Sequence, residues 1–266
     1  MDNLEKLCAE VVKISREAGA FIRSQVQVVT PDNVEYKGIH DFVTYVDKTS
    51  EKMLVEKLSV LLPDSGFLVE EKSVEHTNKE LYWIIDPLDG TTNFLHGLSP
   101  FAVSIALMEK DEVILAVVYE VTQDECFYTW QGGAAYLNGK VIRVTERDKF
   151  SDSLIATGFP YYDYERIHPF LKTLEYFFNN THGVRRLGSA ATDLAYVACG
   201  RFEAFYEYSL HPWDVAAGVL LVKNAGGKVC DFSGKDDYIF GQELIASNAG
   251  IYDELLKVIK SIMVDK

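Results

Sequence analysis

The chain reads WIIDPLDGTTN over residues 83–93. An apolar run within this stretch ends at Asp86, and we expect the strand to stop there because Pro87 has no N–H to donate to a sheet. Asp89 is then expected at the same end of the sheet as Asp86, and Gly90 permits close backbone approach or a positive φ. The stretch therefore predicts a strand, a turn carrying two carboxylates, and a helix.

The end of the stretch predicts an anion site. Thr91 or Thr92 is expected to cap a helix whose free N–H groups point outward, and such groups bind phosphate well. Two carboxylates beside a phosphate cradle need cations between them, and oxygen-rich sites of this kind suit Mg²⁺ or Mn²⁺. An ordinary strand–turn–helix would also use an Asp-Gly pair, but the whole combination favours a functional site.

Other catalytic motifs fit less well. The haloacid-dehalogenase-type motif Asp-x-Asp-Gly-Thr places its carboxylates two positions apart, whereas Asp86 and Asp89 are three apart. No G-x-G-x-x-G, G-x-x-x-x-G-K-[ST], H-E-x-x-H or G-x-S-x-G motif is present in the sequence. Dinucleotide binding, P-loop hydrolysis, zincin chemistry and serine-hydrolase chemistry therefore lose their sequence support.

Further acidic residues lie at the ends of other predicted elements. Glu70 follows the short apolar run 67–69, Asp47 lies at the start of a predicted helix, and Asp214 opens another helix. Taken alone, Asp47 and Asp214 would be ordinary acids at helix N-termini. Together with the stretch at 83–93, they agree with an acidic site.

Hydrophobic periodicity predicts two helices and then an antiparallel sheet in the first half, and alternating strands and helices in the second. In the first half we expect helices near 4–22 and 46–61, a capping box at Asp2 and Glu5, a turn at 31–33, strands at 67–69, 81–85, 102–108, 113–121 and 125–130, and an Asn138-Gly139 hairpin joining 135–137 to 141–144. In the second half we expect strands at 154–157, 184–187, 204–208, 228–231 and 243–246, and helices at 164–178, 190–199, 213–224 and 251–263. A charged stretch at 147–151 predicts two lobes, 1–147 and 148–266, that share an interface.

The composition is that of a globular chain of one or two domains. The 266 residues carry 40 acidic and 26 basic side chains, and the net charge of −14 disfavours non-specific nucleic-acid binding. The four cysteines form no C-x-x-C pair, so we expect buried free thiols. We see no secretory signal and no apolar run that could span a bilayer, so we expect a cytoplasmic protein with no membrane partner.

The motifs resemble those of the inositol monophosphatase family. The two main signatures are 86–93 and the Trp-Asp-x-Ala-Ala-Gly run at 213–218, and further matches fall in the expected order at Asp41–Thr44 with Asp47, Glu70-Glu71, 188–190 and 225–227. The resemblance covers nearly the whole chain and implies an α+β, layered α-β-α-β-α fold shared with fructose-1,6-bisphosphatase. It also implies Mg²⁺-dependent, lithium-sensitive hydrolysis of a small phosphate ester, usually in a homodimer.

The family resemblance further implies which residues hold metal. One ion would be bound by Glu70, Asp86 and the backbone carbonyl of Leu88, and a second by Asp86, Asp89 and Asp214. A third, weaker ion would lie near Glu70, which gives two or three Mg²⁺ per site, with Mn²⁺ as an alternative. Two such cations about 3.5–4 Å apart neutralise a phosphate, activate water and stabilise the leaving alkoxide.

The same resemblance implies the catalytic and substrate-binding residues. Thr91, hydrogen-bonded toward Asp47, would help to position and deprotonate the attacking water, together with Glu70. The N–H groups of Gly90 and Thr91 would bind the phosphate. The substrate side would be formed by Ser189, Ala190, Glu207 and Asp214, with Glu207 binding an inositol hydroxyl, and Lys37 matches a lysine of the bacterial pattern.

Two positions depart from the family pattern, and the substrate stays open. Val69 and Lys72 stand where smaller residues are usual, which could change the loop near the third metal. Inositol monophosphate is the first choice; fructose 1,6-bisphosphate, NADP or a 3′-phosphoadenosine nucleotide is the alternative, with Lys37, Arg185 and Arg186 as the only clustered basic candidates for a second phosphate. A non-catalytic regulatory protein on the same fold ranks lowest, because the expected metal ligands are all present. The loop at Tyr161–Tyr164 is expected to be exposed near the site.

Overall fold

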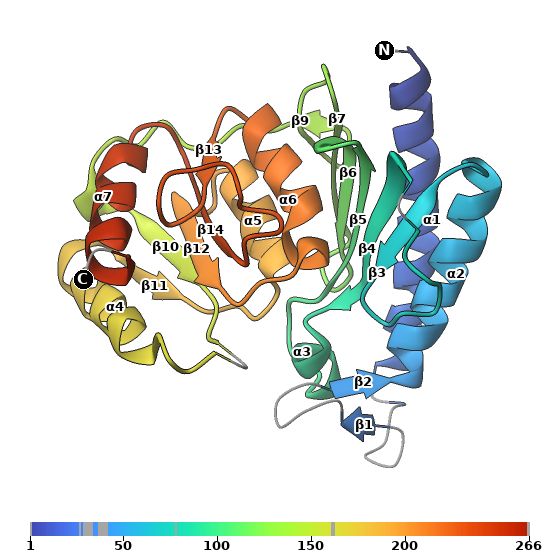
Figure 1. Ribbon diagram of the computed structural model, residues 1–266, viewed down its shortest axis with the longest axis horizontal. Coiled ribbons are helices and arrows are strands. Elements are labelled where there is room, and N and C mark those ends of the chain that lie inside the picture. The colour runs from blue at the N-terminus through green and yellow to red at the C-terminus, as the bar shows by residue number, and fades with distance from the viewer. Residues whose placement is uncertain are drawn as a thin grey trace.

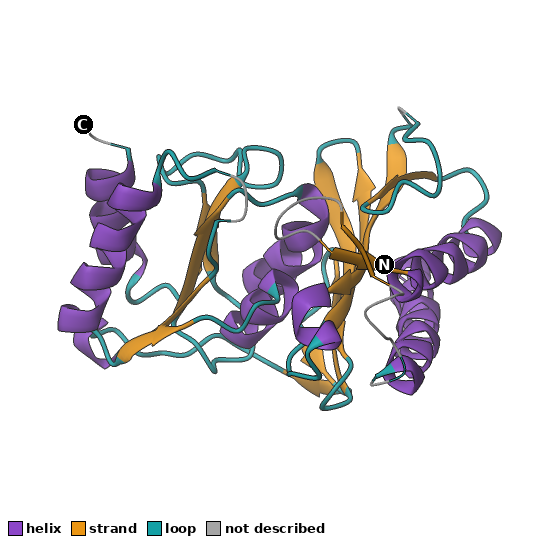
Figure 2. Ribbon diagram, turned by 90° about the horizontal axis from the view of Figure 1, so that it is seen from below, coloured by secondary structure: helices purple, strands orange, loops and turns teal. Residues whose placement is uncertain are grey.

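The computed structural model describes residues 2–26, 28, 34–36, 42–77, 79–160 and 163–264. These residues form five layers, in the order helices, sheet, helices, sheet, helices (Figures 1 and 2). The layered α+β architecture expected from the resemblance is therefore confirmed. The expected turn at 31–33 lies outside the described residues, as does the Asp2 side chain of the expected capping box.

The larger sheet has the strand order β3-β4-β5-β6-β7-β8-β9. Only the β3–β4 pair is parallel, and every other neighbouring pair is antiparallel. Its strands are β3 (Gly66–Val69), β4 (Leu81–Asp89), β5 (Ala102–Glu109), β6 (Glu112–Glu120), β7 (Glu125–Trp130), β8 (Tyr136–Leu137) and β9 (Lys140–Val141). The expected hairpin is present, with positive φ angles of 47° at Asn138 and 83° at Gly139, although its second strand ends at Val141 rather than at residue 144.

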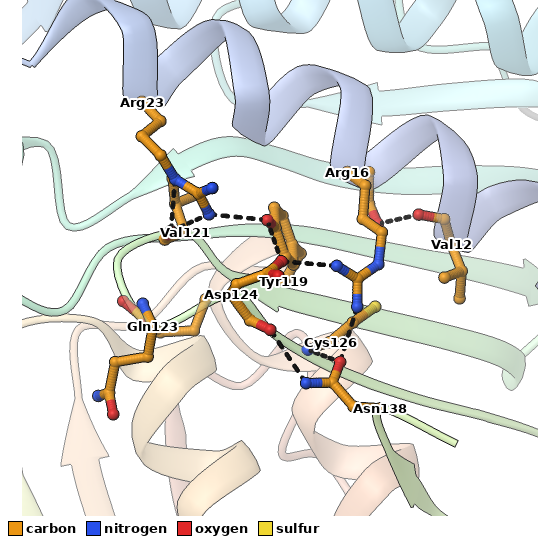
Figure 3. A network of polar contacts seen from close by, with 11 residues as sticks. Val12, Arg16, Arg23, Tyr119, Val121, Gln123, Asp124, Cys126 and Asn138 are labelled. Atoms are coloured by element: carbon orange, nitrogen blue, oxygen red, sulfur yellow. Dashed lines mark hydrogen bonds and ion pairs between the residues drawn. The ribbon is translucent and has the colours of Figure 1, made fainter.

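Polar contacts fasten helix α1 (Asp2–Gln25) to this sheet (Figure 3). The Arg16 guanidinium lies 2.6 Å from Asp124 Oδ1 and donates to Asn138 Oδ1 at 2.7 Å. About two turns further along, Arg23 Nη2 donates to the Tyr119 hydroxyl at 2.9 Å. The helix is thereby held against the β6–β7 turn and the β8–β9 hairpin.

The smaller sheet has the strand order β11-β10-β12-β14-β13. Its strands are β10 (Leu154–Thr157), β11 (Gly183–Arg185), β12 (Ala204–Tyr208), β13 (Lys228–Cys230) and β14 (Glu243–Ser247). The remaining elements are α2 (Tyr45–Leu61), α3 (Thr91–Leu95), α4 (Ile167–Asn180), α5 (Ala190–Ala198), α6 (Pro212–Asn224), α7 (Tyr252–Met263), the 3₁₀ turn η2 (Phe150–Asp152) and the two-stranded pair β1 (Val34–Tyr36) and β2 (Phe42–Thr44). Helices α5 and α6 lie between the two sheets, whereas α4 and α7 cover the outer face of the smaller one (Figure 1).

Three hydrophobic cores fill the spaces between the layers. One lies between the α1/α2 layer and the larger sheet, around Trp83 and Leu54. A second surrounds α5 and α6 between the sheets, and a third joins the smaller sheet to α4 and α7 around Phe177 and Tyr206. Both sheets therefore have two buried faces, as near-continuous apolar strands such as β5 and β6 require.

The expectation that the strand ends at Pro87 is wrong. Strand β4 continues to Asp89, and its pairing with β5 shifts from Asp86 opposite Ser104 to Asp89 opposite Ala102. Two residues of β4, Pro87 and Leu88, thus face a single residue of β5. This β-bulge is one of the few places where a proline fits inside a sheet, because the extra residue makes no ladder hydrogen bond.

Two helix starts also differ from the expected ones. Neither Thr91 nor Thr92 caps α3, since its N-cap residue is Gly90, with φ 92° and no side-chain cap. Thr91 is the first helical residue, and its hydroxyl donates elsewhere. Helix α4 begins at Ile167, after a turn in which Ile167 N donates to the Tyr164 carbonyl, rather than at residue 164.

All four cysteines are free thiols, and only Cys199 is partly exposed. Across the part of the chain that the structure describes, no helix combines the length and the apolar character needed to cross a membrane. The expected division into lobes at residue 147 stays a prediction.

Candidate active site

Five segments that are distant in the sequence line one pocket. They are the end of β3, the β4 bulge with the start of α3, the loop after β10, the loop leading into α5, and the segment from β12 into α6. The lining residues are Glu70, Asp86, Leu88, Asp89, Gly90, Thr91, Thr92, Gly158, Arg186, Gly188, Ser189, Ala190, Asp193, Glu207, Ser209, Leu210, His211, Trp213 and Asp214. The metal, catalytic and substrate-binding residues that the resemblance implied lie in this pocket wherever the structure describes them, except Asp47, which is buried directly behind Thr91.

The β4 bulge positions the first carboxylate. Asp86 Oδ1 accepts a hydrogen bond from Leu88 N at 2.9 Å, which closes the bulge on itself. The Pro87 carbonyl accepts from Ser50 Oγ of α2 at 3.0 Å, so the bulge is also tied to the helix behind it. One Asp86 oxygen is therefore engaged by the backbone, while the carboxyl group as a whole lines the pocket.

Thr91 and Asp47 form a hydrogen-bonded pair at the start of α3. Thr91 Oγ1 lies 3.0 Å from Asp47 Oδ1 and 3.0 Å from the Leu88 carbonyl, so its single proton can serve either acceptor. Asp47 is fixed in turn, since its Oδ2 accepts from Thr44 N at 2.8 Å and from Thr44 Oγ1 at 2.6 Å. Burial raises the pKa of Asp47, and the hydrogen bonds from Thr44 and Thr91 oppose that rise.

Helices α5 and α6 hold two more carboxylates at their N-termini. Asp89 Oδ2 accepts from Ser189 Oγ at 2.6 Å and from Ala191 N at 2.8 Å, in the first turn of α5. Asp214 Oδ2 accepts from His211 N at 2.6 Å, as the third residue of α6. Helix N-termini favour negative charge, so both positions suit a carboxylate.

These hydrogen bonds nevertheless do not offset the burial and the mutual repulsion of the carboxylates. Burial, followed by repulsion from Glu70, Asp89 and Asp214, raises the pKa of Asp86 well above its ordinary value. Burial likewise raises the pKa of Asp89 to about 6 and that of Asp214 to about 8. Arg186 is the cation that opposes the rise at Asp89. A site that desolvates this much acid suits a bound cation.

The carboxylate side chains are not yet arranged as the ligands of a metal ion. Among the described residues, no three Asp, Glu, His or Cys side chains form a group that could hold an ion as they stand. Asp86, Asp89 and Asp214 each turn one oxygen toward an N–H of the chain instead of toward a shared ion position. Cation binding would therefore require small rotations of these side chains.

Glu51, which was not singled out from the sequence, supports the loop that carries Glu70, and we call this contact the Glu51 clamp. Glu51 is fully buried on α2, and its two oxygens accept from Glu71 N at 2.7 Å and from Ser73 N at 2.8 Å. Its position four residues after Asp47, on the same face of α2, is the signal that could have identified it.

The substrate side also holds a residue that the sequence did not indicate. Asp193 is buried on α5 beside Glu207, and no motif marks it. Arg186, expected as a basic candidate, lines the pocket, whereas Arg185 is exposed on β11 and does not. Lys37, Asp41, Tyr161 and Tyr162 lie outside the described residues.

The sequence profile of the inositol monophosphatase family matches residues 3–263. An inositol-1-monophosphatase of Mesorhizobium japonicum is 41% identical over 251 residues, covering 94% of each chain. A Nus factor SuhB of Escherichia coli K12 is 40% identical over 248 residues, covering 92% of each. The crystal structure of the extragenic suppressor protein suhB from Bartonella henselae superposes with a TM-score of 0.88 at 38% identity, over 94% of this chain and 96% of that one. The chain belongs to the inositol monophosphatase family.

The Glu51 clamp can be tested by Glu51→Gln, which keeps the size of the side chain but removes one acceptor. We expect faster amide hydrogen exchange in 70–75 and a fall of about 1–3 kcal/mol in the free energy of unfolding, because one backbone N–H loses its partner. Hydrogen exchange followed by mass spectrometry measures the first effect, and urea unfolding the second.

Glu120→Gln is the matched control. Glu120 is equally buried and accepts from Thr122 N and Gln123 N, but it lies outside the pocket. In Glu120→Gln, the rate of amide hydrogen exchange in 70–75 should equal that of the wild type. Unchanged exchange in 70–75 of Glu51→Gln would show that the clamp does not hold this loop.

Proposed function

We propose that this member of the inositol monophosphatase family hydrolyses the phosphate monoester of a small polyol, with myo-inositol monophosphate as the first choice, using metal-activated water. The observation that carries the proposal is the meeting of Asp86, Asp89 and Asp214 in one pocket with the Thr91–Asp47 pair. Relatives named as inositol-1-monophosphatases support the substrate. We also expect a cytoplasmic homodimer.

The donor set fits Mg²⁺ or Mn²⁺. Glu70, Asp86 and the Leu88 carbonyl would hold one ion, and Asp86, Asp89 and Asp214 a second, with a third near Glu70. All of these donors are hard oxygens, and the raised carboxyl pKa values are the expected sign of uncompensated negative charge. When bound, the ions would neutralise the phosphate and lower the pKa of the attacking water.

Thr91 and Asp47 orient that water. When the Thr91 hydroxyl donates a hydrogen bond to Asp47 Oδ1, its Oγ1 can accept a hydrogen bond from a water in the pocket that Thr91 lines; a proton that passes from this water to Oγ1 would be matched by transfer of the Thr91 proton to Asp47. Asp47 cannot turn away easily, because Thr44 holds its other oxygen. Glu70, on the clamped loop, would complete the catalytic set.

The remaining pocket residues bind the ester. The N–H groups of Gly90 and Thr91, at the start of α3, would hold the phosphate oxygens. Ser189 and Ala190 line the side toward α5, and Glu207 and Asp214 would accept hydrogen bonds from the alcohol. Because Glu207 and Asp214 are negatively charged hydrogen-bond acceptors, the arrangement favours a neutral polyol over a second phosphate.

A regulatory role is the second candidate. It is favoured by the relatives named Nus factor SuhB, which are as similar as the named phosphatase within one percentage point of identity. The intact carboxylate set argues that such a role would accompany catalysis rather than replace it. The expectation that the chain binds no nucleic acid stays a prediction.

A substrate panel with Mg²⁺ tests the proposed function. Phosphate release should be fastest from myo-inositol 1-phosphate and slow from fructose 1,6-bisphosphate, NADP and 3′-phosphoadenosine 5′-phosphate, because the pocket carboxylates repel a second anionic group. Release from only the bisphosphate or the nucleotides would overturn the choice of polyol.

The metal role can be tested by Asp89→Asn. We expect turnover to fall about 100-fold or more while the fold survives, because the amide removes charge that the cations need. Steady-state kinetics at saturating Mg²⁺ and circular dichroism are the measurements. Asp231→Asn, a buried aspartate outside the pocket, is the control, and near-wild-type activity of Asp89→Asn would refute the role.

The raised pKa values predict an unusual pH dependence of stability. The folded chain keeps protons on Asp89 and Asp214 that the unfolded chain releases above about pH 4, so the free energy of unfolding should fall as pH rises from about 4 to 8 in EDTA. Mg²⁺ at 100 times its Kd should raise the free energy of unfolding by about 2.7 kcal/mol near pH 8. Urea unfolding across this range measures both effects, and stability that is independent of Mg²⁺ would contradict them.

A further inference from the structure

Asp193 is a buried carboxylate with one oxygen that is unpaired among the described residues. It lies in the first turn of α5, is 1% exposed and lines the pocket. Its Oδ1 has no hydrogen-bond partner in the described part of the chain. Buried polar atoms are nearly always paired, so an orphaned acceptor on a residue that lines a pocket points to a missing ligand group.

Glu207 stands beside Asp193 and is buried against the backbone at Gly158. The two charges interact, since Glu207 is the largest cause after burial for the raised pKa of Asp193. A side chain at position 158 would place its Cβ 1.9 Å from Glu207 Oε1, so the glycine there lets the carboxylate sit against the backbone. Two acid groups therefore face the same part of the pocket, with Arg186 as the neighbouring cation.

The chemistry of this pair selects its ligand. Carboxylates accept hydrogen bonds, so they suit groups with several donors. A second phosphate would be repelled by both groups, whereas adjacent hydroxyls of a polyol can donate to each of them. The Arg186 guanidinium can donate to an oxygen of the same ligand.

We propose that Asp193 is a specificity-determining residue that, with Glu207, accepts hydrogen bonds from two hydroxyls of the leaving alcohol. This inference rests on the proposed polyol phosphatase activity and extends it: the preferred substrate carries at least two free hydroxyls beside the ester. A substrate whose leaving group lacks hydroxyls gains nothing from Asp193.

Two variants test the inference, Asp193→Leu and the more conservative Asp193→Asn. The measurement is kcat/KM for myo-inositol 1-phosphate and for p-nitrophenyl phosphate, whose leaving group carries no further hydroxyl. We expect Asp193→Leu to lose about 10- to 100-fold more on the inositol ester than on the aryl ester, and Asp193→Asn to lose less in the same direction.

Stability separates binding from structure. Because Asp193 Oδ1 is unpaired, Asp193→Leu should be at least as stable as the wild type in urea unfolding. Glu203→Gln is the control, since Glu203 is a buried acid that accepts from Leu154 N and lies outside the pocket. Its ratio of the two kcat/KM values should equal that of the wild type.

The outcomes distinguish the inference from the proposed function. Equal losses on both esters, or lower stability of both Asp193 variants, overturn the role of Asp193 while the polyol activity of the wild type stands. A wild-type protein that does not hydrolyse the inositol ester refutes the proposed function, and the inference with it.

Discussion

Burial of acidic groups without matching positive charge is the constraint on which this site depends. Asp86 comes from the β4 bulge, Asp89 from the end of that strand, and Asp214 from the start of α6, and each is desolvated. Such burial is unfavourable unless the groups are protonated or compensated. The N-termini of α5 and α6 compensate only part of the charge, and cations would compensate the rest.

The layered fold explains how these groups meet. Helices α5 and α6 are buried between the two sheets, so their N-termini reach the edge where β4 ends (Figure 1). Ser104 of β5 donates to the Trp213 carbonyl at 3.2 Å, and Asn93 of α3 donates to the Leu187 carbonyl at 2.8 Å. The pocket is therefore formed jointly by the end of the larger sheet, by the smaller sheet and by the α5/α6 layer between them.

The sequence predicted most elements because their periodicity is strong and their ends carry clear turn signals. Strands β5 to β7 and the Asn138-Gly139 hairpin are examples. It failed at Pro87, because a bulge depends on the neighbouring strand, and at Thr91, whose hydroxyl binds Asp47 instead of capping α3. Glu51 and Asp193 went unnoticed because the burial of a single acid on a helix shows only in the tertiary packing, and the spacing of Glu51 four residues after Asp47 was a local signal that was missed.

The most direct measurement is the anomalous difference density of a crystal soaked in Mn²⁺ at millimolar concentration. We predict at least two peaks about 3.5–4 Å apart between Glu70, Asp86, Asp89 and Asp214, with the freed carboxylate oxygens turned toward them. A map with no peak there, and with Asp86, Asp89 and Asp214 keeping only their present hydrogen bonds to the backbone and to Ser189, would contradict it.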